Sequence, residues 1–133
     1  MVTVMSIILG LDVSTSITAI CLMDESGKIL ESEAYRLEKE EDVFKKASVV
    51  EAGLKNIKSK YNVTNVFIES PVMVFQSGAS SAFTIAKLQC FNGMVSLLAY
   101  QLFNVVPKYL TPAEARKCCN IKMDKSLITK NYK

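Results

Sequence analysis

The sequence predicts an α/β protein built on a mixed five-stranded sheet with flanking helices. Two observations carry this prediction: three short apolar stretches near the start, separated by turn residues, and a later alternation of helix and strand patterns. Strands joined by hairpins pair antiparallel, whereas strands joined through a helix pair parallel, so both directions should occur in one sheet. The expected order is three strands, a helix, a strand, a helix, a strand and a last helix.

The first three strands are predicted over residues 5–11, 17–23 and 29–35. The first two are apolar runs, the second with β-branched residues, and the third alternates in polarity. Ser14 to Ser16 forms the first turn. Asp24 to Lys28 is a short connection containing a glycine, which predicts that the second and third strands form an antiparallel hairpin.

An amphipathic helix is predicted from residue 43 to about residue 61, and a fourth strand over 63–68. The helix shows apolar residues every three or four positions, at Val43, Ala47, Val50, Leu54, Ile57 and Tyr61. The strand is apolar and β-branched and ends in Glu69-Ser70-Pro71.

A long helix is predicted from Ala82 to Phe103, with Ser80 or Ser81 as its N-cap. It is apolar over most of its circumference, so we expect it to be buried on more than one side. A short strand over 105–109 follows. Thr111-Pro112-Ala113-Glu114 then predicts the start of a further helix, with Thr111 as N-cap and Glu114 completing a capping box.

Length and composition favour one globular domain over residues 1–133. The 16 Lys and Arg exceed the 13 Asp and Glu by three, a mild basic excess that lies mostly near the C-terminus. Four cysteines without a CxxC pair, and no histidine, argue against a zinc site or a disulfide framework and favour the reducing cytoplasm. The apolar stretch 94–106 is interrupted by Ser96, Gln101 and Asn104, so we expect no membrane span.

Asp12 and Glu69 are the candidate catalytic residues and metal ligands. Each follows a buried strand, and if the first and fourth strands are parallel neighbours, the two carboxylates meet at one edge of the sheet. Hard oxygen donors without His favour Mg²⁺, or Mn²⁺. The alternative is that Asp12 caps the turn through Ser14 to Ser16 and that Glu69 is a solvated strand end.

The stretches "ILGLDVSTSITAICLMDESGKIL", "NVFIES" and "SAFTIAKLQCFNGMVSLLAYQL" closely resemble the RuvC-like Holliday junction resolvases, particularly phage-type and viral members, within the ribonuclease H-like fold. The resemblance implies a magnesium-dependent endonuclease that resolves branched DNA. It assigns Asp12 and Glu69 as ligands for two-metal hydrolysis of a phosphodiester. Family members carry further acidic ligands on a later helix, and neither Glu114 nor Asp124 matches them well. We therefore expect residues 1–133 to lack the final catalytic helix.

Candidate DNA contacts are spread along the chain. Phe75 could wedge between bases at a branch point, as the analogous loop does in resolvases, or could fold back onto the core. The other candidates are polar or cationic residues that could contact phosphates: Ser14, Gln76, Ser77, Lys87, Arg116 and Lys117. Arg116 and Lys117 could equally be ordinary charges on a helix surface.

The segment Phe91-Asn92-Gly93-Met94 resembles the one used for dimer packing in these resolvases, and Gly93 would allow another backbone to approach. A homodimer suits a substrate in which two strands must be cut. A monomer remains the alternative.

Two other functions remain open. A catalytically incomplete module that binds branched DNA or dimerises would explain the missing late acids. The opening "LGLDVSTS" also resembles the first phosphate-binding loop of actin-like ATPases and sugar kinases, in which Asp12 would hold magnesium and Ser14 to Ser16 would contact a nucleotide.

Overall fold

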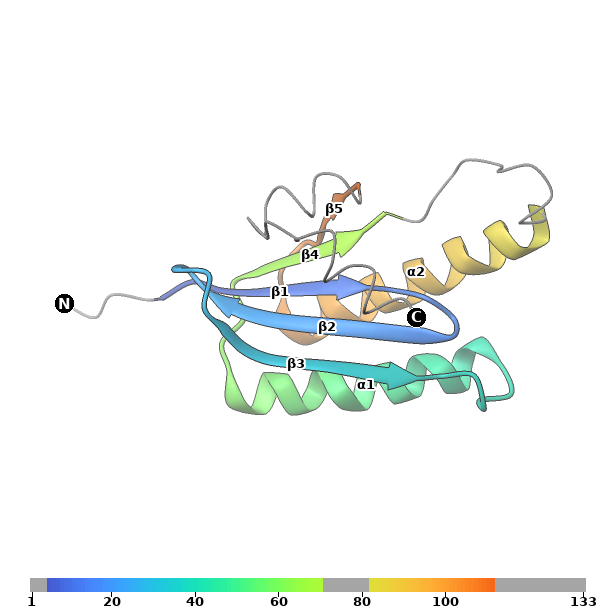
Figure 1. The fold of residues 1–133 in the computed structure, drawn as a ribbon, viewed down its shortest axis with the longest axis horizontal. Helices are drawn as coiled ribbons and strands as arrows, with labels where there is room; N and C mark the ends of the chain where they lie inside the picture. Colours follow the sequence, from blue (N-terminus) through green and yellow to red (C-terminus); the bar gives the residue numbers. More distant parts are fainter. Residues whose placement is uncertain (1–4, 71–81, 112–133) are drawn as a thin grey trace, which may run out of the picture.

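The computed structural model describes residues 5–70 and 82–111 (Figure 1). In chain order the elements are β1 (Ile7–Asp12), β2 (Ile17–Asp24), β3 (Ile29–Arg36), α1 (Val43–Lys60), β4 (Asn65–Glu69), α2 (Ala82–Phe103) and β5 (Lys108–Leu110). Every helix and strand predicted within these ranges is present. The helix predicted from Thr111 onward lies outside the described residues.

The strands form one five-stranded sheet in the order β3-β2-β1-β4-β5. The pairs β1–β2 and β2–β3 are antiparallel, and the pairs β1–β4 and β4–β5 are parallel. The fold class predicted from the sequence is therefore confirmed, including both strand directions. β1 lies at the centre and has β4, the first strand after a helical crossover, as its parallel neighbour.

The core lies between one face of the sheet and the two helices. Leu9 and Leu11 of β1 point to this side, and α1 and α2 contact each other over it. Further large buried side chains come from β2, β4, the helices and, with Leu37, the segment after β3: Ile20, Leu22, Leu37, Val50, Leu54, Ile57, Val66, Ile68, Phe91 and Val95. Because side chains alternate along a strand, Gly10 and Asp12 face the opposite side of the sheet, which neither helix covers.

The β2–β3 hairpin turns as predicted, and Asp24 organises it. One carboxylate oxygen of Asp24 accepts hydrogen bonds from the Ser26 hydroxyl at 2.6 Å, the Ser26 amide at 2.9 Å and the Lys28 amide at 3.1 Å. These bonds, the Ser26 hydroxyl first among them, hold the pKa of Asp24 below its usual value of 3.8. Gly27 adopts φ 88°, which a side chain would disfavour.

Two boundaries differ from the sequence-based expectation. β4 begins at Asn65, because the Thr64 amide and hydroxyl both bond the Ile7 carbonyl before the regular ladder starts. β5 begins at Lys108, because α2 is followed by a left-handed residue, Asn104, at φ 56° that turns the chain out of the helix. Residues 105–107 then lead the chain back to β4.

α2 is buried on one side only, so the expectation of burial on several sides is wrong. Phe91, Asn92, Val95, Ser96 and Ala99 form its buried face. The opposite side is apolar as well: Phe83, Leu97 and Tyr100 are 77%, 54% and 45% exposed. The reason is that both helices lie on one sheet face, so α2 has the sheet and α1 as neighbours and nothing else from the described residues.

The length and composition of α2 would also allow it to cross a membrane. Among the described residues it is the one helix that passes this test, with a mean hydropathy of 1.3 over its most apolar window, of which 28% is buried. One such helix is weak evidence for a span, because a core helix of a soluble protein passes the same test. Here the buried face of α2 packs onto the sheet core.

α1 packs closely against β3 at Gly53. The Tyr35 ring lies over this glycine, and a Cβ built there would overlap the phenol. The Tyr35 hydroxyl donates a hydrogen bond of 2.9 Å to a carboxylate oxygen of Glu33, which fixes the ring in place. A glycine inside a helix costs about 1 kcal/mol relative to alanine, so its presence here reflects the space that Tyr35 occupies.

We expect Gly53→Ala to lower the free energy of unfolding in the wild-type background, because Tyr35 must give up its position. In a Tyr35→Ala background the same change should raise it by about 1 kcal/mol, the helix propensity gain alone. Urea unfolding of the four proteins measures the coupling. An equal effect of Gly53→Ala in both backgrounds would show that the contact with Tyr35 does not matter.

Candidate active site

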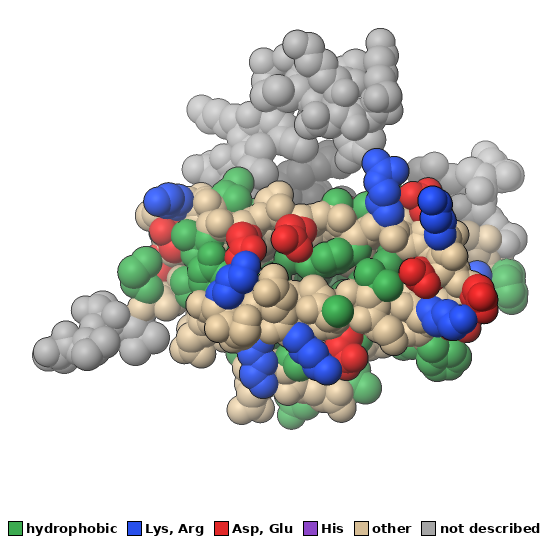
Figure 2. Space-filling model, turned by 90° about the horizontal axis from the view of Figure 1, so that it is seen from below, with side chains coloured by type: hydrophobic (Ala, Val, Ile, Leu, Met, Phe, Trp, Pro, Cys, Tyr) green, Lys and Arg blue, Asp and Glu red, His purple; other side chains and the backbone are tan. Residues whose placement is uncertain are grey.

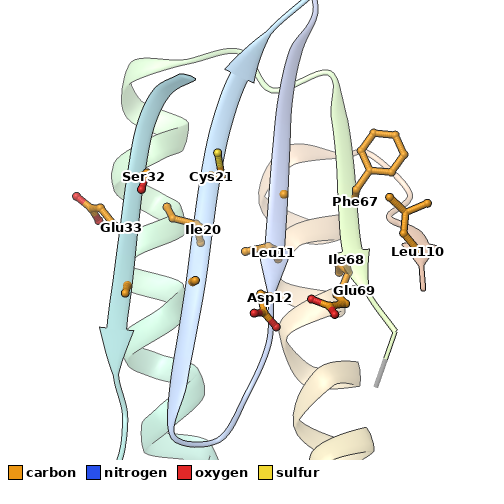
Figure 3. A pocket seen from close by; sticks show the side chains of 13 residues that line it. Leu11, Asp12, Ile20, Cys21, Ser32, Glu33, Phe67, Ile68, Glu69 and Leu110 are labelled. Atoms are coloured by element: carbon orange, nitrogen blue, oxygen red, sulfur yellow. The ribbon is translucent and has the colours of Figure 1, made fainter. Parts of the chain in front are cut away.

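Asp12 and Glu69 end two neighbouring parallel strands at the same edge of the sheet. In the β1–β4 ladder Leu11 pairs with Ile68, so the next residue on each strand is a carboxylate. Leu11 and Ile68 point into the core, and therefore Asp12 and Glu69 both project from the open face. Figure 3 shows the two carboxylates side by side. Adjacent strands lie about 4.8 Å apart, which brings both groups within reach of one cation.

The open face of the sheet is hollowed next to these carboxylates. The cavity has a volume of about 460 Å³, and both Asp12 and Glu69 contribute to its lining. The rest of the lining is mostly small or apolar and includes Gly10, Ala19, Cys21, Ala34, Phe67 and Leu110 (Figure 3). The two acids therefore stand at one end of a mostly apolar surface that also carries Ser32 and Glu33, with Asp12 exposed and Glu69 half-buried.

The turn after Asp12 is held by an internal set of hydrogen bonds. The hydroxyl of Thr18, a fully buried residue, donates to the Ser14 carbonyl at 2.9 Å and accepts from the Ser14 amide at 3.4 Å. The Ser14 and Ser16 hydroxyl oxygens are 3.0 Å apart, and the Leu37 amide donates to the Ser16 carbonyl at 2.8 Å. Thr18 and Leu37 thus close the turn through groups other than Asp12, which argues against a purely capping role for this carboxylate.

Lys46 is a residue at this turn that the sequence did not single out. Its ammonium group donates a 2.6 Å hydrogen bond to the Thr15 carbonyl, joining α1 to the β1–β2 turn. Lys46 is half-buried, whereas its neighbour Lys45 is exposed and pairs with Glu41 at 2.9 Å. In the sequence both are ordinary lysines of an amphipathic helix, and only the difference in burial distinguishes them.

The predicted dimer segment splits between the interior and the surface. Phe91 and Asn92 are 0% and 4% exposed and face the core, so they present no side chain to a partner. This corrects the expectation for these two residues, and the reason is that α2 turns this stripe toward the sheet. Gly93 is exposed, with open space where a Cβ would stand, and Met94 packs partly against the core.

Only two of the predicted DNA-contact residues lie within the described part of the chain. Ser14 lies in the turn beside Asp12, and Lys87 is exposed on α2. The remaining candidates, together with Glu114 and Asp124, lie outside the described residues: Phe75, Gln76, Ser77, Arg116 and Lys117. On the described part of the face seen in Figure 2, Lys and Arg alternate with Asp and Glu and form no single basic patch.

The donors at the strand ends fit magnesium or manganese. Within residues 5–70 and 82–111 no cluster of three His, Cys, Asp or Glu side chains could hold a metal ion, so Asp12 and Glu69 form a pair without a third acid. Mg²⁺ keeps several waters and is commonly bound by one or two carboxylates together with substrate phosphates. A paired-carboxylate site of this kind suits binding of a metal together with a phosphate.

Sheet order and strand directions define an α/β protein of the ribonuclease H-like class. Among solved structures the chain is similar to Thermus thermophilus RuvC, with a TM-score of 0.63 and 14% identity over 84% of this chain and 67% of that one. It is also similar to T. thermophilus RuvC in complex with a Holliday junction substrate, with a TM-score of 0.64 and 12% identity over 95% and 77% of the two chains. No protein-family model and no curated protein sequence matches the chain. The likeness at this identity establishes the RuvC-like fold.

We expect Lys46→Met to loosen the turn beside Asp12, because the Thr15 carbonyl loses a charged donor. Protection of the Ser14 and Ser16 amides against hydrogen exchange should fall about tenfold, the equivalent of a hydrogen bond to a charged group. Lys45→Met is the matched control and should leave these amides unchanged. Equal protection in all three proteins would remove Lys46 from the support of the turn.

Proposed function

We propose that this protein is a metal-dependent endonuclease that cuts branched DNA, with Holliday junctions as the reference substrate. The observation that carries the proposal is the pairing of Asp12 and Glu69 at the ends of adjacent parallel strands. The RuvC-like fold supports it, since one of the similar structures was solved with a Holliday junction substrate. The sequence resemblance favours a phage-type or viral member.

In this proposal Asp12 and Glu69 hold Mg²⁺, or Mn²⁺, and orient it toward a DNA phosphate. The metal supplies Lewis-acid polarisation of the phosphate and a nucleophile at neutral pH. The Ser14 hydroxyl, fixed by the turn, donates to a phosphate oxygen next to the scissile bond. Lys87, and from outside the described residues Phe75, Gln76, Ser77, Arg116 and Lys117, contribute further DNA contacts.

A third acidic ligand belongs to the complete site and comes from outside the described residues. Residues 1–133 form one domain in this proposal. The absence of a third acid near Asp12 and Glu69 among the described residues also favours a second candidate function, a branched-DNA-binding module without catalysis. The proposed location is the cytoplasm, where Cys21 and Cys90, which form no disulfide in the described part, would stay reduced.

Asp12→Asn should reduce Mg²⁺-dependent cleavage of a four-way junction by the full-length protein on the order of 100-fold, because one metal ligand is lost. Junction binding should stay within about twofold, since phosphate contacts dominate affinity. Glu25→Gln, an exposed acid at the opposite end of the sheet, is the control and should cleave normally.

Cleavage and binding assays on the same junction distinguish the candidate functions. Undiminished cleavage by Asp12→Asn would remove this residue from the mechanism. A wild-type protein that binds the junction but never cuts it would favour the non-catalytic module. Tight ATP binding without junction binding would favour the nucleotide-binding alternative.

The outer stripe of α2 supports a homodimer. We define this outer stripe by six exposed residues in two series with seven-residue spacing: Phe83, Cys90 and Leu97, and Ala86, Gly93 and Tyr100. Such 3-4 spacing of apolar and small residues is the seam that pairs helices, and Gly93 at its middle admits a close partner backbone. A second copy with the same stripe is the natural occupant, and a two-fold dimer would place two sites on a substrate with two strands to cut.

Leu97→Glu should convert the dimer into a monomer, weakening association by about 100-fold, because a charge within a helix seam must be desolvated. Phe44→Glu tests another exposed apolar residue, on α1, and should leave the dimer intact. Sedimentation velocity at several protein concentrations checks both variants. A wild-type monomer, or a dimer indifferent to Leu97→Glu, would refute pairing through the outer stripe.

A further inference from the structure

Asn92 and Ser96 form a polar pair inside the apolar interior beneath the candidate site. They are 4% and 7% exposed and lie one turn apart on α2, with the fully buried Phe91 and Val95 as neighbours. A buried amide loses its bonds to water and remains stable only where the protein replaces them. The partners of Asn92 therefore indicate what this position does.

The Asn92 amide reaches the strand that carries the second carboxylate. Its side-chain nitrogen donates to the backbone carbonyl of Glu69 at 3.3 Å. The Ser96 hydroxyl donates to the backbone carbonyl of Asn92, one turn earlier on α2, at 2.7 Å and lies 3.4 Å from the Asn92 side-chain oxygen. Asn92 thus connects α2 with the end of β4, whereas the shorter bond of Ser96 stays within the helix backbone.

At the end of β4 the pairing with β1 stops one residue before Glu69, at Ile68. On the other side the Ser70 amide donates to the Leu110 carbonyl at 2.7 Å, which attaches this end to β5. The Glu69 carbonyl and the Ser70 amide belong to one peptide unit, so Asn92 holds this unit from the α2 side and Leu110 holds it from the β5 side. The placement of this unit is one of the constraints on the direction in which the Glu69 side chain projects.

We propose that Asn92 is a positioning residue that orients Glu69 for metal binding. The inference rests on the proposed nuclease function and adds to it a residue that contacts neither metal nor DNA. Removing a hydrogen bond that supports a metal ligand commonly weakens metal affinity about tenfold or more. Leucine at this position would fill the same space yet leave the Glu69 carbonyl without its donor.

The test compares Asn92→Leu with Ser96→Ala, since both remove a polar group from the same buried face and only the first removes the bond to Glu69. Mn²⁺ binding to the full-length protein, measured by calorimetry at equal margins below each melting temperature, should weaken about tenfold in N92L. It should change less than twofold in S96A. The carbonyl ¹³C resonance of Glu69 should shift in N92L and stay in place in S96A.

Unchanged Mn²⁺ affinity in N92L, or equal weakening in both variants, would overturn the proposal and leave a packing role only. If N92L does not fold, the same two measurements are made on Asn92→Ala. Val95→Ala, which leaves a cavity on the same buried face, is then the matched control. The Glu69 carbonyl resonance separates the two hypotheses. A wild-type protein that binds no Mn²⁺ contradicts the nuclease function, whereas an unshifted resonance in the Asn92 variants contradicts the positioning contact itself.

Discussion

The parallel pairing of β1 with β4 is the constraint on which the site depends. Two parallel strands whose ladder ends at Leu11 and Ile68 must carry their next residues to the same edge and the same face. Two carboxylates placed there repel each other unless a proton, a donor or a cation intervenes. The hydrophobic core on the other face fixes this register, because a shift by one residue would turn Asp12 and Glu69 into the interior.

Much of this arrangement followed from the sequence, because connectivity limits topology. A short turn at Asp24 to Lys28 permits only an antiparallel neighbour, and the helix between β3 and β4 makes a parallel pair available to β1. The adjacency of Asp12 and Glu69 could therefore be predicted on the condition that β1 and β4 are parallel neighbours, which the sheet order shows. Their roles as ligands remain a prediction, because the fold places the oxygens together without showing what they bind.

Contacts between distant segments were beyond the reach of sequence patterns. Lys46 and Thr15 are 31 residues apart, and Asn92 and Glu69 are 23 apart, so neither pair has a periodicity that would reveal it. Asn92 was assigned to a dimer contact because the segment Phe91-Asn92-Gly93-Met94 resembles the one that packs resolvase dimers, and only the rotation of α2 about its axis shows that Asn92 faces inward. The burial of α2 was overestimated for a related reason: apolar content measures how much surface a helix could bury, not how many neighbours it has.

The turn between β1 and β2 is held by hydrogen bonds from the protein itself, since Thr18, Leu37 and Lys46 bond its backbone from three sides. A loop that must become rigid on binding loses conformational entropy, and that loss is subtracted from affinity. Here the loss is borne during folding instead. In the proposed nuclease a phosphate beside Asp12 would meet hydroxyl groups whose positions are already set, so this corner of the molecule would select by shape matching rather than by adaptation.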